Sequence, residues 1–158
     1  MTSPLITVLM PARNAGAYIA ETVRSLRAQT MADFELLVVD DDSSDDTVPQ
    51  TRAAAAGDER LRLVTGQGRL GFSGALNLGL SLARGALIAR MDADDIAVPR
   101  RLEIQAGYLK AHPGTGLCGG RVQTFGLRAG RFHCLPLSHE QTLCYALFDN
   151  PFAHPTVM

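Results

Sequence analysis

The chain has 158 residues, of which 46% are hydrophobic and 20% are charged, and 15 basic residues nearly balance 16 acidic ones to give a formal net charge of −1. This length and composition predict one soluble globular domain and exclude a disordered chain. The near-neutral charge excludes the strongly basic surface that nucleic acids and anionic membranes attract, so no nucleic-acid partner is expected and any anion-binding site must be local.

Strand-like and helix-like segments alternate from the start of the chain. The continuous apolar run of residues 5–12 predicts a strand that is buried on both faces. Residues 17–29 predict a helix, because Ile19, Val23 and Leu26 recur at the spacing of one helical face. Together they predict a first strand–helix unit.

The same pattern continues along the chain. A second buried strand is expected over residues 34–39, and a third over residues 60–65. Between them, Ser44 or Asp45 is placed to cap a helix that runs through Ala56.

A third helix and a fourth strand–helix unit follow a glycine-rich turn. Residues 73–83 predict the helix, residues 86–91 the strand, and residues 99–112 a fourth helix with Pro99 in its first turn. Successive strand–turn–helix units favour an open α/β fold, with a mostly parallel sheet and helices on both of its faces.

The alternation becomes less regular after Pro113. Residues 116–125 predict another strand, residues 130–140 a loop or an edge strand, and residues 139–148 a short helix. Residues 150–158 form a segment with two prolines that is expected to start a further strand. Since the sequence stops inside this apolar run, we expect a single domain that is incomplete at its carboxyl end.

Targeting and cross-linking signals are missing from the sequence. The first residues lack a basic segment, and no apolar run approaches the roughly 20 residues of a membrane-spanning helix, so neither a signal peptide nor a direct membrane span is expected. We expect a cytoplasmic domain, either free or peripheral to a membrane. The three cysteines suggest free thiols, and with two histidines they lack the paired spacing of a zinc site; these residues are Cys118, His133, Cys134, His139 and Cys144.

Polar residues follow each of the first four predicted strands. Ligands of an open parallel sheet lie beyond the carboxyl ends of its strands, so these residues are expected to face one crevice. They occupy residues 11–14, 40–42, 66–71 and 92–95.

The carboxylates of Asp92 and Asp94 close the fourth predicted strand. In extended backbone, residues two apart point to the same side, so both carboxylates can approach one point. A divalent cation with oxygen ligands makes such a pair favourable and can also bridge the phosphates of a diphosphate. The alternative is a solvated turn in which Asp94 or Asp95 caps the helix near Pro99. The polar ends of the other strands favour the metal site.

The acidic residues after the second strand divide into three groups. Asp40 directly follows the strand and is expected to accept hydrogen bonds from backbone amides of the turn. Asp41 is placed to reach the crevice, where a carboxylate can accept the N–H groups of uracil or guanine. The remaining residues, Asp42, Asp45 and Asp46, fit a solvated loop and the start of a helix.

The glycine-rich turn offers an alternative function. Gly66, Gly68 and Gly71 fit the G-x-G-x-x-G pattern of dinucleotide-binding proteins, with Asp92 at a suitable distance for the ribose, which would make the chain a dinucleotide-dependent oxidoreductase. A dinucleotide site needs one carboxylate for the ribose, whereas this crevice gathers Asp41, Asp92 and Asp94. It would also leave the polar residues after the first two strands without a role. Arg69 in this turn is expected to meet a phosphate or base of a nucleotide, with a solvated loop arginine as the alternative.

Two stretches resemble the nucleotide-sugar-binding half of the family 2 glycosyltransferases, which have the GT-A fold. They are residues 6–47, which contain PARN and VVDDDSSDDT, and residues 71–109, which contain ARMDADDIAVP. The closing NPFAHPTVM resembles a segment of bacterial members. The resemblance implies a Rossmann-like domain over residues 1–158, in which residues 1–112 are the nucleotide-sugar-binding half and residues 113–158 begin an incomplete acceptor half.

The resemblance also implies an activity and a set of site residues. It implies an inverting transferase that moves a sugar from a nucleotide-diphosphate donor, most often UDP-linked, to an acceptor hydroxyl with Mg²⁺ or Mn²⁺. On this basis Pro11 and Arg13 contact the base, Asp41 binds uracil, and Asp92 and Asp94 hold the metal, with Asp94 as the direct ligand. Arg13 stands where the family often has a tyrosine, so no aromatic ring is expected to stack on the base there.

The catalytic base of the family, an Asp or Glu, is expected beyond the segment that ends at Met158. We therefore assign none of the carboxylates of this chain as the base, and we expect donor binding without robust transfer. A non-catalytic nucleotide-sugar-binding module is the alternative from another functional class. His154 is expected to be a turn residue, or to face the acceptor.

Overall fold

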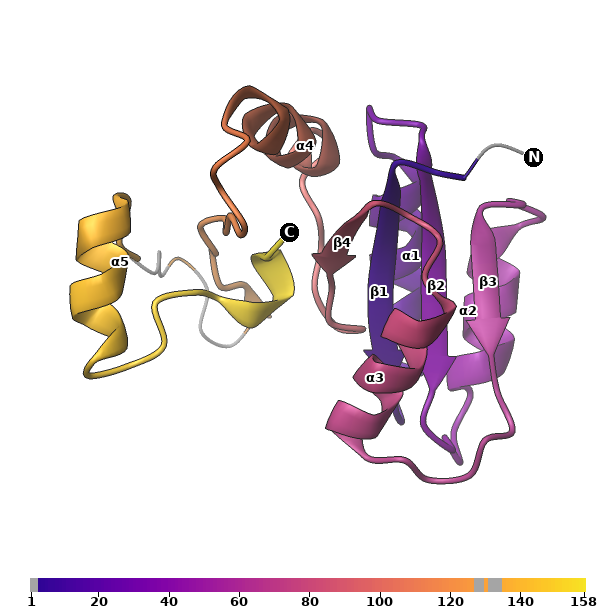
Figure 1. Cartoon of the computed structure of the whole chain (residues 1–158). Coiled ribbons are helices and arrows are strands. Elements are labelled where there is room, and N and C mark those ends of the chain that lie inside the picture. The colour runs from indigo at the N-terminus through magenta and orange to yellow at the C-terminus, as the bar shows by residue number, and fades with distance from the viewer. Residues whose placement is uncertain (1–2, 127–129, 131–134) are drawn as a thin grey trace.

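A four-stranded parallel sheet forms the centre of the molecule (Figure 1). The computed structural model describes residues 3–126, 130 and 135–158. The strand order is β3-β2-β1-β4, and each strand lies within one residue of its predicted bounds. The strands are β1 Ile6–Ala12, β2 Phe34–Asp40, β3 Leu61–Val64 and β4 Leu87–Arg90.

Side chains of the two central strands alternate between two hydrophobic clusters. Ile6, Val8 and Met10 of β1 lie in the larger cluster, whereas Leu9 lies in the smaller one on the other face. Every residue of β1 and β2 is buried, which explains why their sequences are mostly apolar, with Thr7, Glu35 and Asp40 as the polar exceptions. These buried strands fix the register, with Ile6 opposite Phe34 and Leu87.

Helices cover both faces of the sheet, as predicted. Residues of α1 (Ile19–Arg27), α2 (Thr47–Ala55) and α4 (Arg101–Ala111) pack in the larger cluster, and α3 (Phe72–Leu82) packs on the opposite face. Figure 1 shows α3 in front of the sheet, with α1 and α2 behind it. The arrangement confirms an open α/β fold.

Two helix starts differ from the prediction. The N-cap of α2 is Asp46 rather than Ser44 or Asp45, although the Oδ1 atom of Asp45 accepts a hydrogen bond from the Thr47 amide at 3.0 Å. Helix α4 begins after Arg100, so Pro99 lies in the turn before the helix and not in its first turn. The Pro99 carbonyl instead accepts a hydrogen bond from the Thr30 amide at 2.9 Å.

The segment after α4 differs most from the expected secondary structure. The strand predicted over residues 116–125 is wrong, since only an isolated bridge occurs there, at Gln123. Helix α5 (His139–Ala146) confirms the predicted short helix; among the described residues it has no buried side chain, and Figure 1 places it apart from the sheet. Part of the loop or edge strand expected over residues 130–140, with His133 and Cys134, lies outside the described residues.

The last residues pack against the free edge of β4. They contain the 3₁₀ helix η2 (His154–Thr156) and not the expected strand. Met158 and Cys118 exchange two backbone hydrogen bonds of 2.9 Å, and the Val157 carbonyl accepts from the Arg90 amide at 2.9 Å. This pairing brings η2 next to the carboxyl end of β4. In the described part of the chain, none of the helices is long and apolar enough to cross a bilayer.

Candidate functional site

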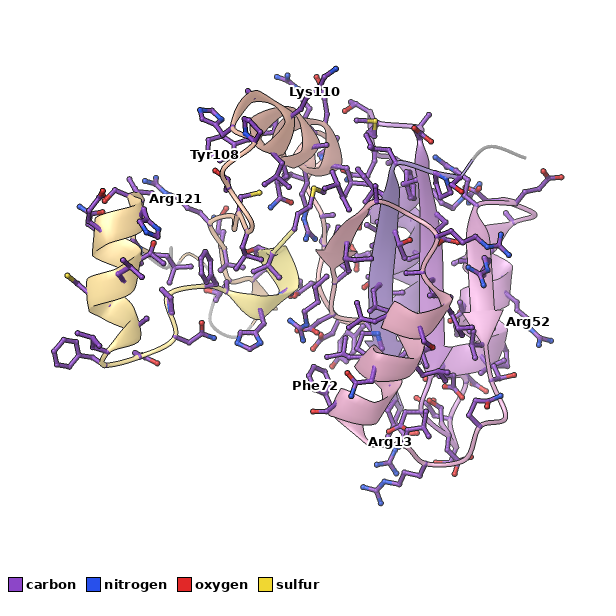
Figure 2. The ribbon with its side chains drawn as sticks, viewed as in Figure 1. Arg13, Arg52, Phe72, Tyr108, Lys110 and Arg121 are labelled. Atoms are coloured by element: carbon purple, nitrogen blue, oxygen red, sulfur yellow. The ribbon has the colours of Figure 1, made fainter. Side chains whose placement is uncertain are left out.

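The carboxyl ends of the parallel strands lie at one edge of the sheet, where the predicted site residues gather. Figure 2 shows Arg13 and Phe72 at this end of the molecule, next to the start of α3. Pro11 is buried within β1, whereas Arg13 is exposed. The side chain of Arg13 has no hydrogen bond or ion pair to any residue that the structure describes, so it is available to a ligand.

The loop after β1 is held by the loop after β2. The Asn14 amide donates to Ser43 Oγ at 3.0 Å, and the Gly16 amide donates to Asp45 Oδ2 at 2.9 Å. A hydrogen bond from Thr47 holds the pKa of Asp45 below its ordinary value. These contacts fix the backbone that carries Arg13.

Two buried aspartates lie at the end of β2, and Asp41 rather than Asp40 makes the stronger hydrogen bonds to the backbone. Asp40 accepts one long hydrogen bond, from the Ser43 amide at 3.3 Å. Asp41 is 4% exposed and accepts from the amides of Leu70 at 2.5 Å and Gly71 at 3.1 Å. Its carboxylate therefore anchors the glycine-rich loop at the start of α3. Base recognition by Asp41 remains a prediction, and this anchoring is a role that the sequence did not reveal.

The glycine-rich loop has the backbone of a turn and lacks the packing of a dinucleotide fingerprint. Gly71 precedes α3 with φ 74° and ψ 166°, a conformation open essentially to glycine alone. A Cβ at Gly71 would meet nothing within 4 Å, whereas the third glycine of the fingerprint is needed for close helix–strand packing. The loop also follows the edge strand β3. The oxidoreductase alternative is not favoured, and Arg69 is exposed.

Three carboxylates meet directly after β4. One oxygen from each of Asp92, Asp94 and Asp95 lies within 4.8 Å of the others. The prediction that extended backbone aligns Asp92 and Asp94 is wrong, because β4 ends at Arg90. A turn at residues 93–94 brings the side chains together instead. The alternative helix-capping role of Asp94 or Asp95 is not observed, because α4 has no side-chain cap. Asp95 is an additional member that the sequence did not assign to the metal.

The carboxylates lie in an environment that disfavours their charge. Burial raises the pKa of Asp92, and the neighbouring Asp94 raises it further. Burial likewise raises the pKa of Asp95, together with the charges of Asp92 and Asp94. Converging oxygens with unbalanced negative charge are what a hard divalent cation such as Mg²⁺ or Mn²⁺ prefers, so the donor set fits such an ion. No other such group of His, Cys, Asp or Glu occurs in the described chain.

Two basic side chains border the acidic cluster. Arg90 Nη2 lies 2.5 Å from Asp92 Oδ1, and the guanidinium carbon of Arg90 lies 5.2 Å from the ring centroid of Phe72. His154 begins η2, which packs against β4, and its charge acts to lower the pKa of Asp92. Arg90 was not among the predicted site residues, and its position two residues before Asp92 was the available signal.

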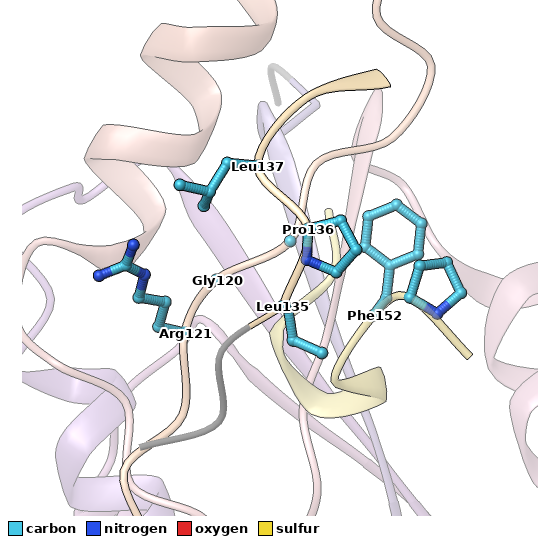
Figure 3. Close-up of a pocket in the computed structure, with 8 residues that line it drawn as sticks. Gly120, Arg121, Leu135, Pro136, Leu137 and Phe152 are labelled. Atoms are coloured by element: carbon cyan, nitrogen blue, oxygen red, sulfur yellow. The ribbon is translucent and has the colours of Figure 1, made fainter. Parts of the chain in front are cut away.

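A small cavity lies in the segment after α4 and not at the strand ends. It has a volume of about 90 Å³ and is lined by residues that include Arg121, Leu135, Pro136 and Phe152 (Figure 3). None of the predicted site residues lines it. Cys118 and Cys144 lie in the same segment and, among the described residues, are free thiols.

Comparison with known proteins identifies relatives of the whole described domain. The model of glycosyl transferase family 2 matches residues 7–156. An uncharacterized glycosyltransferase of Haemophilus influenzae is 32% identical over 165 residues, which cover 98% of this chain and 51% of that protein. The chain thus spans about half the length of this curated relative.

Solved structures share both the fold and part of the sequence. TarS of S. aureus (residues 1–349), in complex with UDP-GlcNAc, has a TM-score of 0.63 and 28% identity over 68% of this chain and 32% of that one. The mannosyltransferase PcManGT of Pyrobaculum calidifontis, in complex with GDP-Man and Mn²⁺, has a TM-score of 0.69 and 29% identity over 78% of this chain and 37% of that one. These neighbours establish a glycosyltransferase fold of the GT-A type.

Proposed function

The chain belongs to glycosyl transferase family 2, and on that premise we propose that it forms the metal-dependent donor site of an enzyme that transfers a sugar from a UDP-sugar to an acceptor hydroxyl. The observation that supports this most strongly is the cluster of Asp92, Asp94 and Asp95 at the carboxyl end of β4. One structural neighbour binds a UDP-sugar, and another binds GDP-Man with Mn²⁺.

The side chains at the strand ends divide the work of donor binding. Asp92, Asp94 and Asp95 would hold a Mg²⁺ or Mn²⁺ ion, which when bound supplies positive charge for the departing diphosphate. Pro11 and Asp41 border the expected base, and one lone pair of the Asp41 carboxylate remains for a base N–H beyond its three amide contacts. The free guanidinium groups of Arg13 and Arg69 are placed to meet the base or the phosphates.

The proposed reaction is a single displacement with inversion at the anomeric carbon. A bond forms between the acceptor oxygen and that carbon, the bond to the diphosphate breaks, and a base takes the acceptor proton. We assign no described carboxylate to the base, because Asp41 is bound to backbone amides and the acidic cluster is assigned to the metal. The base is expected in the part of the family's domain that lies beyond the residues of this chain.

Calorimetric titration with UDP and GDP tests the proposal. We expect UDP to bind in Mn²⁺ and to lose at least about tenfold in affinity in chelator or in Asp94→Asn. Unchanged UDP affinity in both conditions would contradict the metal assignment. The 158-residue chain should bind UDP without robust transfer to any acceptor hydroxyl, and transfer by this chain would overturn the assignment of the base elsewhere. Binding of GDP in preference to UDP would reassign the nucleotide.

A further inference from the structure

An arginine is built into the edge of the proposed metal site. Arg90 is the last residue of β4, its side chain is 12% exposed, and its Nη2 atom pairs with Asp92 Oδ1. Within the described part of the chain, its Nε and Nη1 atoms have no hydrogen-bond partner. A buried guanidinium with unused donors beside a carboxylate cluster is costly unless a further anion completes its environment.

The position of this arginine is fixed from three sides. The Arg90 amide donates to the Val157 carbonyl at 2.9 Å, and its carbonyl accepts from Arg101 Nη2 at 2.7 Å. The Phe72 ring covers the guanidinium face at 5.2 Å, which favours the charged group through a cation–π contact. The positive charge is therefore held beside Asp92 and cannot easily move into solvent.

The charges of the cluster do not favour a divalent ion that arrives alone. The cluster carries three carboxylates, of which Asp92 pairs with Arg90, and the positive charges of Arg90 and Arg101 both act on Asp95. The three carboxylates and two guanidinium groups leave a net formal charge of −1 at neutral pH, which does not balance the +2 charge of a divalent ion. A nucleoside diphosphate supplies the missing negative charge and can use the free donors of Arg90.

We propose that Arg90 is a positioning residue and counter-cation that holds Asp92, disfavours a divalent ion alone and favours the diphosphate, so that ion and nucleotide enter the site together. This inference rests on the proposed function, because it assumes that the cluster binds a metal. It adds a role for a side chain that contacts neither the metal nor the transferred sugar.

The chain contains a matched arginine that serves as a control. Arg60 Nη2 pairs with Asp58 Oδ2 at 2.7 Å, and its guanidinium carbon lies 4.4 Å from the Phe34 ring centroid. This second Arg–Asp–Phe group lies at the start of β3, away from the carboxyl ends of the strands. Arg60→Met removes the same kind of ion pair and ring contact without a nearby acidic cluster.

Two binding measurements on the 158-residue chain test the inference. Binding of Mn²⁺ alone is followed by the electron paramagnetic resonance signal of the free ion, and binding of UDP in chelator by calorimetry. In Arg90→Met we expect Mn²⁺ to bind about tenfold more tightly and UDP about threefold more weakly, because a unit positive charge has been removed. Arg90→Lys keeps the charge and should restore both affinities to near the original values. Arg60→Met should change neither affinity.

The opposite signs of the two effects separate this role from a structural one. Loss of local structure in Arg90→Met would weaken both ligands, and that result, or unchanged affinities, would overturn the inference while leaving the proposed function intact. If Arg90→Met fails to fold, Phe72→Leu decides, because Phe72 is 54% exposed and its removal admits water that screens Arg90. A rise of about twofold or more in Mn²⁺ affinity supports the inference, and no rise overturns it. Failure of the unmodified chain to bind UDP or GDP with Mn²⁺ would overturn the proposed function as well.

Discussion

Glu35 at the amino end of the sheet and the acidic cluster of Asp92, Asp94 and Asp95 at its carboxyl end are surrounded in opposite ways. At the amino end, Glu35 is 5% exposed, and its carboxylate accepts hydrogen bonds of 2.7 Å from Thr7 Oγ1, Arg62 Nη1 and the Arg84 amide. Burial alone raises the pKa of Glu35, but these partners hold it below the ordinary value. At the carboxyl end, burial and like charges raise the pKa of Asp92 and Asp95. Glu35 is thus satisfied within the protein, whereas the cluster of Asp92, Asp94 and Asp95 keeps unbalanced negative charge.

The largest effect on stability is expected from Glu35→Ala. Removing the carboxylate leaves the partly buried Arg62 and the buried Thr7 without their common acceptor, so the free energy of unfolding should fall by about 3 kcal/mol. Urea unfolding measures this change, and UDP affinity per folded molecule should stay the same. The exposed pair of Arg100 and Glu103 provides the control, since Glu103→Ala removes a solvated ion pair and one exposed hydrogen bond from Thr30 and should lower stability by less than about 1 kcal/mol. Equal effects of the two substitutions would contradict the contrast between buried and exposed pairs.

Asp95→Asn is expected to change the affinity for Mn²⁺ rather than the stability of the chain, and by a smaller free energy than Glu35→Ala. If Asp95 completes the metal site, Mn²⁺ affinity in the presence of UDP should fall about tenfold. Stability without metal should not fall, because the substitution removes a charge that its surroundings disfavour. The control is Asp46→Asn, an exposed acidic residue after β2. A loss of stability in Asp95→Asn with unchanged Mn²⁺ affinity would show that this end of the sheet is structural.

The pH dependence of stability should also have opposite signs at the two ends. The pKa values of Asp92 and Asp95 are raised in the folded chain, so in chelator the folded state binds more protons than the unfolded state just above the ordinary value of 3.8. Stability should therefore fall as the pH rises through this window, and Mn²⁺ should cancel the fall. The hydrogen bond from Arg60 lowers the pKa of Asp58 to about 2, so its contribution is present above 3.8 and is lost as the pH falls toward 2.

Thermal unfolding of Asp95→Asn and Asp58→Asn across the pH range measures each contribution. The difference in stability between Asp95→Asn and the unmodified chain should grow as the pH rises above 3.8. The difference in stability between Asp58→Asn and the unmodified chain should disappear near pH 2. If the stability contributions of Asp95 and Asp58 changed with pH in the same direction, the contrast between an unsatisfied Asp95 and a satisfied Asp58 would be wrong.

Most of the parallel sheet could be predicted because its signals are local. The strands β1 and β2 are buried on both faces and mostly apolar, so they could hardly pack in another way. The segment over residues 116–125 looked similar, yet a strand needs a neighbour, and local hydrophobicity does not say which edge is available. Here the last residues of the chain, rather than residues 116–125, occupy the edge of β4.

The candidate site was predictable in position but not in detail. The rule for strand ends in open sheets placed Asp92 and Asp94 at the correct edge. It could not include Asp95, because the turn that brings this carboxylate inward depends on packing. The anchoring role of Asp41 depends on where the glycine-rich loop crosses the site, and the role of Arg90 depends on the Phe72 ring from a different helix. Each of these contacts joins segments distant in the sequence.

The smallest effect is expected from Arg13→Ala, which tests whether an unpaired charge at the carboxyl end exists for a ligand. Arg13 is exposed and has no partner among the described residues, so its removal should leave the midpoint of thermal unfolding unchanged. UDP affinity in Mn²⁺ should fall about threefold, because a solvated cation near a phosphate or base contributes modestly. Arg52 on α2 is also exposed, and Figure 2 shows it away from Arg13 and Phe72, so Arg52→Ala removes an equal charge at a distance. Equal losses of UDP affinity in both variants would reflect the net charge of the protein, and Arg13 would then have no specific place in the site.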